Sequence, residues 1–167
     1  MHGFVKCEVV MTSKSVLLDT NFFIHLLQEN SALHENANGY FKYFCEQNIK
    51  MKISTISIAE YCVIGSLDEL PLKDLQIVPF NIEHAVKTGE FAKYVFERKS
   101  QISVERKLIP NDTKLFAQAD VDSSVEFYLS SDTGSLKVYE LLKTKGSINF
   151  KFVNLHNNYL DSFGKLF

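Results

Sequence analysis

Short apolar runs alternate with segments of helical periodicity along nearly the whole chain, and this alternation constrains the fold most strongly. The apolar runs are "SVLL" (15–18), "MKIST" (51–55), "LQIVPF" (75–80), "VEFYLSS" (125–131) and "INFKFVNL" (148–155). Helical spacing of apolar residues is found within 20–30, 37–48, 57–67, 81–99, 111–121 and 133–146. Because parallel strands need crossover connections, usually helices, the pattern predicts an α/β fold of three layers around a mostly parallel sheet.

A single domain is expected over residues 1–167, because the length is near the usual domain size and no linker or internal repeat divides the chain. The content of 46% hydrophobic and 13% aromatic residues excludes a disordered chain. Two terminal segments lie outside the alternating pattern. We treat residues 1–14 as an N-terminal extension and residues 156–167 as a C-terminal tail of unassigned structure.

Charge and cysteine content bear on partners and compartment. A formal net charge of −2 argues against coating nucleic acid through bulk charge, but it leaves open an enzyme that grips a strand with one basic patch. Three cysteines without metal-binding spacing suit a reducing compartment. No apolar run reaches the roughly 18 residues of a membrane span, and Lys6 and Glu8 interrupt any signal-peptide pattern. We therefore expect a cytoplasmic protein that does not bind a membrane.

Acidic residues recur where predicted strands give way to helices. Asp19 follows the first apolar run, and Asp132 follows "VEFYLSS". Glu60 is expected in the first turn of the helix after "MKIST", and Asp112 opens the helix of 111–121. In open α/β sheets ligands bind beyond the carboxyl ends of the strands, so these four side chains are expected to converge at one edge if their strands are neighbours.

Each acid also suits a purely structural role. Asp is a preferred N-cap, and "SIAE" matches a capping box in which Glu60 reaches back to the backbone of Ser57. The sequence around Asp19 favours more than a cap, because Thr20 and Asn21 add two further polar groups. A cap needs one side chain, whereas a metal-binding carboxylate needs neighbours that orient it by hydrogen bonds.

Four segments, in chain order, resemble the four motifs of the PIN domain, a family of metal-dependent nucleases that are mostly ribonucleases. They are "LLDTNFFIHLL" (17–27), "ISTISIAEY" (53–61), "IPNDTKLFAQA" (109–119) and "FYLSSD" (127–132), and the resemblance extends from about Val16 to Leu155. It implies a PIN-like three-layer α/β/α sandwich, usually with five strands, and often a homodimer. Many small PIN proteins are toxins of bacterial toxin–antitoxin pairs, so a small antitoxin partner is also implied. The tail after residue 155 has no counterpart that we can assign.

The resemblance implies catalytic and metal-binding roles for Asp19, Glu60, Asp112 and Asp132. It implies that Thr20, Asn21 and Ser130 support the site or contact the substrate. Independently, two carboxylates about 4 Å apart repel by roughly 4 kcal/mol at an effective dielectric near 20, so a cluster of four requires protons or cations. Oxygen ligands without Cys or His favour Mg²⁺ or Mn²⁺, which can activate water for phosphodiester hydrolysis. We predict a Mg²⁺- or Mn²⁺-dependent endonuclease, with RNA as the preferred substrate and DNA left open.

Basic residues near the third motif are candidate nucleic-acid contacts, and the alternative is a solvated helix face. The candidates are Arg98, Lys99, Arg106, Lys107 and Lys114, with Tyr94 or Phe96 available to stack on bases.

Rival enzyme classes lack their motifs: the chain has neither phosphate-binding glycine loop, G-x-x-x-x-G-K-[ST] or G-x-G-x-x-G, and no G-x-S-x-G. Asn21 stands where a haloacid-dehalogenase-like phosphatase needs a second Asp. The remaining alternative is a PIN-like module that binds nucleic acid or protein with weak or no catalysis.

Overall fold

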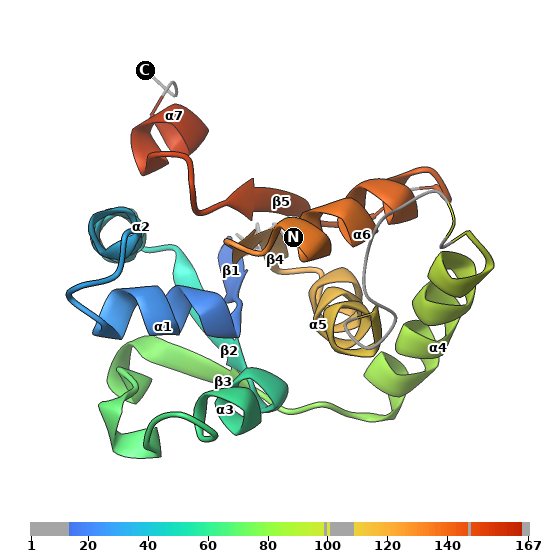
Figure 1. Cartoon of the computed structure of the whole chain (residues 1–167), viewed down its shortest axis with the longest axis horizontal. Helices are drawn as coiled ribbons and strands as arrows, with labels where there is room; N and C mark the ends of the chain where they lie inside the picture. Colours follow the sequence, from blue (N-terminus) through green and yellow to red (C-terminus); the bar gives the residue numbers. More distant parts are fainter. Residues whose placement is uncertain (1–13, 99, 101–108, 147, 165–167) are drawn as a thin grey trace, which may run out of the picture.

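One sheet of five parallel strands forms the centre of the protein (Figure 1). The computed structural model describes residues 14–98, 100, 109–146 and 148–164. The strands are β1 (Ser15–Leu18), β2 (Lys50–Ser54), β3 (Leu75–Val78), β4 (Val125–Ser130) and β5 (Lys151–Asn154), in the spatial order β3-β2-β1-β4-β5. Every neighbouring pair is parallel, which confirms the predicted α/β class and the parallel sheet.

Helices cover both faces of the sheet, as expected for three layers (Figure 1). One face carries α1 (Thr20–Leu27), α2 (His34–Glu46) and α7 (Tyr159–Phe163), whose apolar side chains form one core cluster with β1, β2 and β4. The other face carries α4 (Ile82–Glu97), α5 (Ile109–Val121) and α6 (Thr133–Lys143), which form a second cluster. The short helix α3 (Thr55–Tyr61) follows β2, and two 3₁₀ turns, η1 (Leu67–Glu69) and η2 (Leu72–Asp74), lead to β3.

The first strand is buried on both of its faces. Val16 and Leu18 join the cluster under α1 and α2, whereas Leu17 joins the cluster under α4, α5 and α6. This follows from the two-residue period of a strand, in which successive side chains point to opposite faces. A strand covered by helices on both sides needs a continuous apolar run, which is why "SVLL" shows no polar alternation.

The strand order reverses direction at β1. Along the chain, β2 and β3 extend the sheet on one side of β1, and β4 and β5 extend it on the other. The connections after β1 and after β4 therefore leave toward opposite faces, and the gap between them is the usual ligand position in doubly wound sheets. Asp19 and Asp132 follow these two strands.

The C-terminal segment belongs to the first core cluster. Helix α7 places Phe163 with its ring centroid 4.9 Å from that of Phe127 and 5.3 Å from that of Tyr43. The Tyr40 hydroxyl also lies 2.8 Å from the hydroxyl of Ser162. Part of the tail left unassigned from sequence is thus a helix packed on α2 and β4. Among the described residues, no helix is both long enough and apolar enough to cross a membrane.

Candidate active site

A single pocket at the carboxyl edge of the sheet is lined by all four acids that the sequence singled out. The pocket has a volume of about 360 Å³. Its polar lining consists of Asp19, Glu60, Asp112, Asp132, Thr20, Asn21 and Asn111, and its apolar lining of Ile24, Val63, Ile64 and Leu115. Residues that are up to 113 positions apart in the chain are therefore brought together, as parallel neighbouring strands require.

Asp19 is held by the ends of the two central strands. Its backbone N–H donates to the carbonyl of Leu129, at 3.1 Å. Its Oδ1 accepts from the Thr20 N–H at 2.7 Å, and its Oδ2 accepts from the Ser130 hydroxyl at 2.6 Å. The amide of Asn21 lies 3.5 Å from the same Oδ2. Asp19 is therefore both the N-cap of α1 and the centre of a network that includes Asn21 and Ser130.

Glu60 is fixed by side chains from two other helices. Its Oε2 accepts from the Thr20 hydroxyl at 2.5 Å, and its Oε1 accepts from the Asn111 amide at 3.0 Å. The expected first-turn position and the capping box with Ser57 are wrong. Helix α3 begins at Thr55, and Ser54 is its N-cap, because the strand already ends at Ser54 in extended conformation. Glu60 consequently lies in the second turn of α3, where it lines the pocket.

Asp132 combines the two roles between which the sequence left a choice. Its Oδ1 accepts from the backbone N–H of Gly134 at 2.6 Å and of Ser135 at 3.1 Å, which makes it the N-cap of α6. The same side chain lines the pocket. Capping fixes the orientation of this carboxylate relative to the pocket, so the structural role supports a functional one instead of excluding it.

The acids of the pocket influence one another electrostatically. Burial raises the pKa of Asp19 to about 6, and the charges of Glu60 and Asp132 act in the same direction. Burial also raises the pKa of Asp112 to about 7, with further contributions from the charges of Asp132, Asp19 and Glu60. Both raised pKa values mean that hydrogen bonds and neighbouring charges do not fully offset the cost of ionising these two carboxyl groups at neutral pH.

The donor set fits a hard divalent cation. Only oxygen and amide groups provide polar lining, and the described lining contains no Lys, Arg or His that could neutralise the acids. Beside the acids, the hydroxyls of Tyr128 and Ser135 are buried, and the Ser135 side chain acts to lower the pKa of Asp112 against the effect of burial. Among the described residues, however, no group of three or more His, Cys, Asp or Glu side chains is arranged so that it could hold a metal ion.

Comparison with solved structures identifies the fold. FitAcB from Neisseria gonorrhoeae matches 85% of this chain and 99% of its own, with a TM-score of 0.60 and 17% identity. VapBC2 from Rickettsia felis, bound to a DNA fragment from its promoter, matches 83% and 97%, with a TM-score of 0.58 and 16% identity. VapC20 from Mycobacterium tuberculosis, described as a sarcin-ricin loop cleaving toxin, matches 81% and 98%, with a TM-score of 0.52 and 14% identity. The chain has a PIN-like fold.

This result confirms the fold that the four sequence motifs implied. Comparison by sequence adds no support, since no family model and no curated protein matches the chain. The PIN-like fold thus accounts for the arrangement of strands and helices, and any activity must be argued from the pocket itself.

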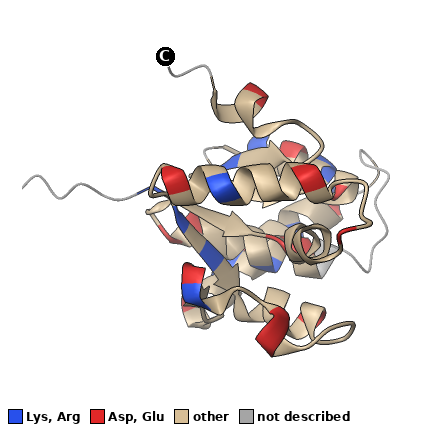
Figure 2. Ribbon diagram, turned by 90° about the vertical axis from the view of Figure 1, so that its left-hand side faces the viewer, with Lys and Arg blue, Asp and Glu red and all other residues tan. Residues whose placement is uncertain are grey.

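Only two of the five basic residues predicted to contact nucleic acid, Arg98 and Lys114, lie in the described part of the chain. Lys99, Arg106 and Lys107 lie outside the described residues. The Arg98 guanidinium lies 3.8 Å from the centroid of the Tyr94 ring, and its Nη1 lies 3.3 Å from Glu97. Lys114 is partly exposed on α5, two residues beyond Asp112. In Figure 2, basic and acidic residues are interspersed along the described part of the ribbon.

Sequence reasoning missed three residues of the pocket and its surroundings. Asn111 was interpreted only as a helix-start signal, yet its amide donates to Glu60. Tyr128 and Ser135 were not singled out, although burial, followed by the charges of Asp19 and Asp112, raises the pKa of Tyr128 well above its ordinary value. The doublet of Asn111 and Asp112 at a helix start was the one signal that could have indicated Asn111. Nothing local in the sequence indicates the other two.

Proposed function

We propose that this protein is a metal-dependent nuclease that hydrolyses RNA, with Asp19, Glu60, Asp112 and Asp132 as its metal-binding carboxylates. The observation that carries the proposal is the pocket in which four acids converge without a described basic neighbour. Burial, together with the charges of the neighbouring acids, raises the pKa of Asp19 to about 6 and that of Asp112 to about 7. A divalent cation relieves this repulsion more effectively than protons do at neutral pH.

Magnesium or manganese ions bound there would supply a water of lowered pKa and stabilise the leaving oxygen of the phosphodiester. The protein's own residues orient the carboxylates. Ser130 and the Thr20 backbone hold the two oxygens of Asp19, while the Thr20 hydroxyl and Asn111 hold those of Glu60. Backbone N–H groups at the start of α6 hold Asp132. Such hydrogen bonds to ligand carboxylates commonly contribute to metal affinity.

The proposal extends to a role as the toxin of a toxin–antitoxin pair. It is supported by the PIN-like fold, by the description of the M. tuberculosis neighbour as a sarcin-ricin loop cleaving toxin, and by VapBC structures bound to DNA from R. felis and Salmonella typhimurium. A small protein antitoxin, a homodimer and a cytoplasmic location are parts of the same proposal. Growth arrest on expression of the wild type, absent for Asp19→Asn, would support the toxin role; harmless wild-type expression would oppose it.

One observation favours the alternative, a PIN-like binding module without catalysis. Among the described residues the acids are not arranged to hold an ion. The two functions are separated by measuring thermal melting in EDTA, Mg²⁺ and Mn²⁺ together with cleavage of single-stranded RNA. A nuclease gives a metal-dependent rise in melting temperature and metal-dependent cleavage, both lost in Asp112→Asn. A binding module gives retention of RNA without cleavage in any metal.

A further inference from the structure

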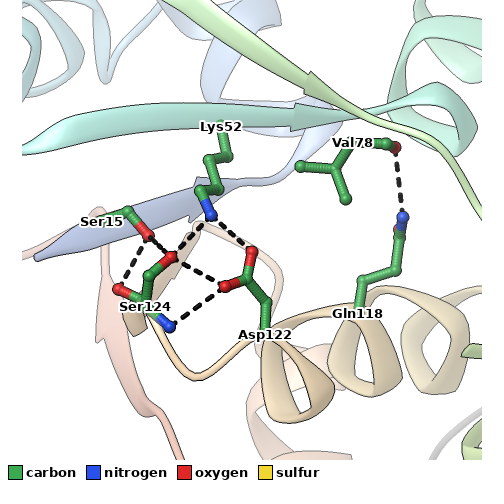
Figure 3. Close-up of polar contacts among 6 residues, drawn as sticks. All are labelled: Ser15, Lys52, Val78, Gln118, Asp122 and Ser124. Carbon is green, nitrogen blue, oxygen red and sulfur yellow. Dashed lines mark hydrogen bonds and ion pairs between the residues drawn. The ribbon is translucent and has the colours of Figure 1, made fainter. Parts of the chain in front are cut away.

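Helix α5 is attached to the sheet by a buried glutamine. Gln118 is 1% exposed and lies on the sheet-facing side of α5, six residues after Asp112. Its Oε1 accepts from the Ser54 hydroxyl at 2.5 Å. Its Nε2 donates to the carbonyl of Val78 at 3.2 Å, the contact drawn in Figure 3. Because a buried amide is costly unless it is hydrogen-bonded, these two contacts favour one position of Gln118 relative to β2 and β3.

The Ser54 hydroxyl connects this contact with a second acid of the pocket. Ser54 ends β2 and is the N-cap of α3, where its Oγ accepts from the backbone N–H of Ile56 at 3.0 Å. The same oxygen donates to Gln118. One hydroxyl therefore joins the start of the helix that carries Glu60 to the helix that carries Asp112.

The C-terminal end of α5 has a second contact with β2. Lys52 of β2 is 4% exposed; its Nζ is paired with Asp122, immediately after α5, and lies 2.7 Å from the Ser124 hydroxyl (Figure 3). Two residues along a strand span roughly 6.6 Å, and four residues along a helix span roughly 6 Å. The distance along β2 from Lys52 to Ser54 therefore matches the distance along the helix from Asp122 to Gln118. Together, the two contacts set the axial position of α5 relative to β2.

We propose that Gln118 is a positioning residue, which fixes the axial position of α5 and thereby places Asp112 and Asn111 opposite Glu60. The inference rests on the proposed nuclease function and adds a residue outside the pocket to it. A slide of α5 by one residue displaces Asp112 by roughly 1.5 Å. Magnesium demands oxygen ligands near 2.1 Å, so displacements of this size weaken coordination without unfolding the helix.

The test compares two variants that each lose buried hydrogen bonds. Gln118→Met keeps the shape of the side chain and removes both contacts. The control, Tyr40→Phe, removes the contact with Ser162 on the opposite face of the sheet. For each, the Mn²⁺ concentration that gives half of the maximal rise in melting temperature is measured, together with kcat and KM for a single-stranded RNA of mixed sequence.

We expect Gln118→Met to raise the half-saturating Mn²⁺ concentration about tenfold and to lower kcat about tenfold with little change in KM, as for a displaced ligand. Tyr40→Phe should change both values less than about twofold, whatever its loss of stability. If the two variants behave alike, Gln118 has only a structural role. Should Gln118→Met not fold, Ser54→Ala replaces it, and unchanged Mn²⁺ binding in that variant overturns the inference. A wild type with neither metal response nor cleavage refutes the nuclease function, and the role of Gln118 with it.

Discussion

The hydroxyl of Ser130 donates a hydrogen bond of 2.6 Å to Oδ2 of Asp19, although the two residues are 111 positions apart in the chain. The bond joins the end of β4 to the residue that follows β1, on the two sides of the point where the strand order reverses. It stabilises the ionised form of a carboxylate whose pKa burial raises to about 6. The position of the acid and its protonation state therefore depend on the same contact.

Replacing Ser130 with Ala should weaken the site more than the fold. Loss of the hydrogen bond removes an influence that lowers the pKa of Asp19, so this pKa rises further. A hydrogen bond to a charged group contributes about 1.5 to 3 kcal/mol, so we expect roughly a ten- to hundredfold loss of RNA cleavage at neutral pH. The acidic limb of the pH–rate profile should move to higher pH. Ser162→Ala is the control, since the Ser162 hydroxyl contacts the Tyr40 hydroxyl and Ser162 does not line the pocket. An equal effect there would contradict the assignment.

Asp112→Asn is expected to stabilise the metal-free protein. At about pH 8 the wild-type carboxylate is ionised against burial and three like charges, which cost free energy that the neutral amide avoids. Allowing for partial solvent exposure, we expect the free energy of unfolding to rise by about 1 to 3 kcal/mol in EDTA. Urea denaturation measures this change.

The matched control for Asp112→Asn is Asp161→Asn, which also removes an acid from the first turn of a helix but lies outside the pocket. That variant should be neutral or slightly destabilising, because it loses a favourable charge at a helix N-terminus. Destabilisation of similar size in both variants would mean that Asp112 acts as a helix-start residue only.

The contribution of Asp19 and Asp112 to the stability of the metal-free protein should decrease as the pH rises from about 5 to about 8. The folded state keeps protons on Asp19 and Asp112 up to about pH 6 and about pH 7, respectively. The unfolded chain releases them near pH 4. Since the folded state binds more protons in this window, the contribution of these two acids to the free energy of unfolding falls with rising pH.

Manganese should reverse this trend, because the cation competes with protons and binds more tightly as the acids ionise. Chemical denaturation at both pH values, with EDTA and with Mn²⁺, provides the comparison. If the pH dependence in EDTA is the same in the wild type and in Asp112→Asn, the electrostatic cost inferred for the pocket acids is contradicted.

Lys52→Met should lower stability by leaving Asp122 without its cation. Lys52 is buried and Asp122 partly buried, so we expect a loss of about 2 to 3 kcal/mol, below the value for a fully buried pair. The pair keeps the pKa of Asp122 low despite partial burial, so its contribution should disappear in acid. The double variant Lys52→Met with Asp122→Ala should recover part of the loss in urea denaturation. An additive double variant would show that the pair is energetically unimportant.

The sequence predicted the parallel sheet and the convergence of the four acids at its edge, for identifiable reasons. Continuous apolar runs such as 15–18 are typical of strands covered on both faces, and acids directly after them must lie at the carboxyl edge. For Asp19 and Asp132, this position directly after a strand was enough to predict where the side chain lies. Their partners Thr20 and Ser130 followed from the family motifs, and their contacts with carboxylates agree with that assignment.

Other features depend on three-dimensional contacts that no local pattern encodes. The start of α3 was misplaced because Ser54 and Ser57 are equally good caps by sequence, and only the end of β2 decides between them. Helix α7 was not predicted because five residues carry too little periodicity, and its stability comes from aromatic contacts with α2 and β4. Gln118 resembles any polar helix residue until its partners on β2 and β3 are known.

The central position of β1 has a consequence for synthesis. The first strand of the chain pairs with β2 on one side and with β4 on the other, so its second edge stays unpaired until residues 125–130 have left the ribosome. Asp19 contacts Ser130, and lies in the same pocket as Asp132, only after that event. A nascent or prematurely terminated chain that ends before β4 therefore lacks the pocket.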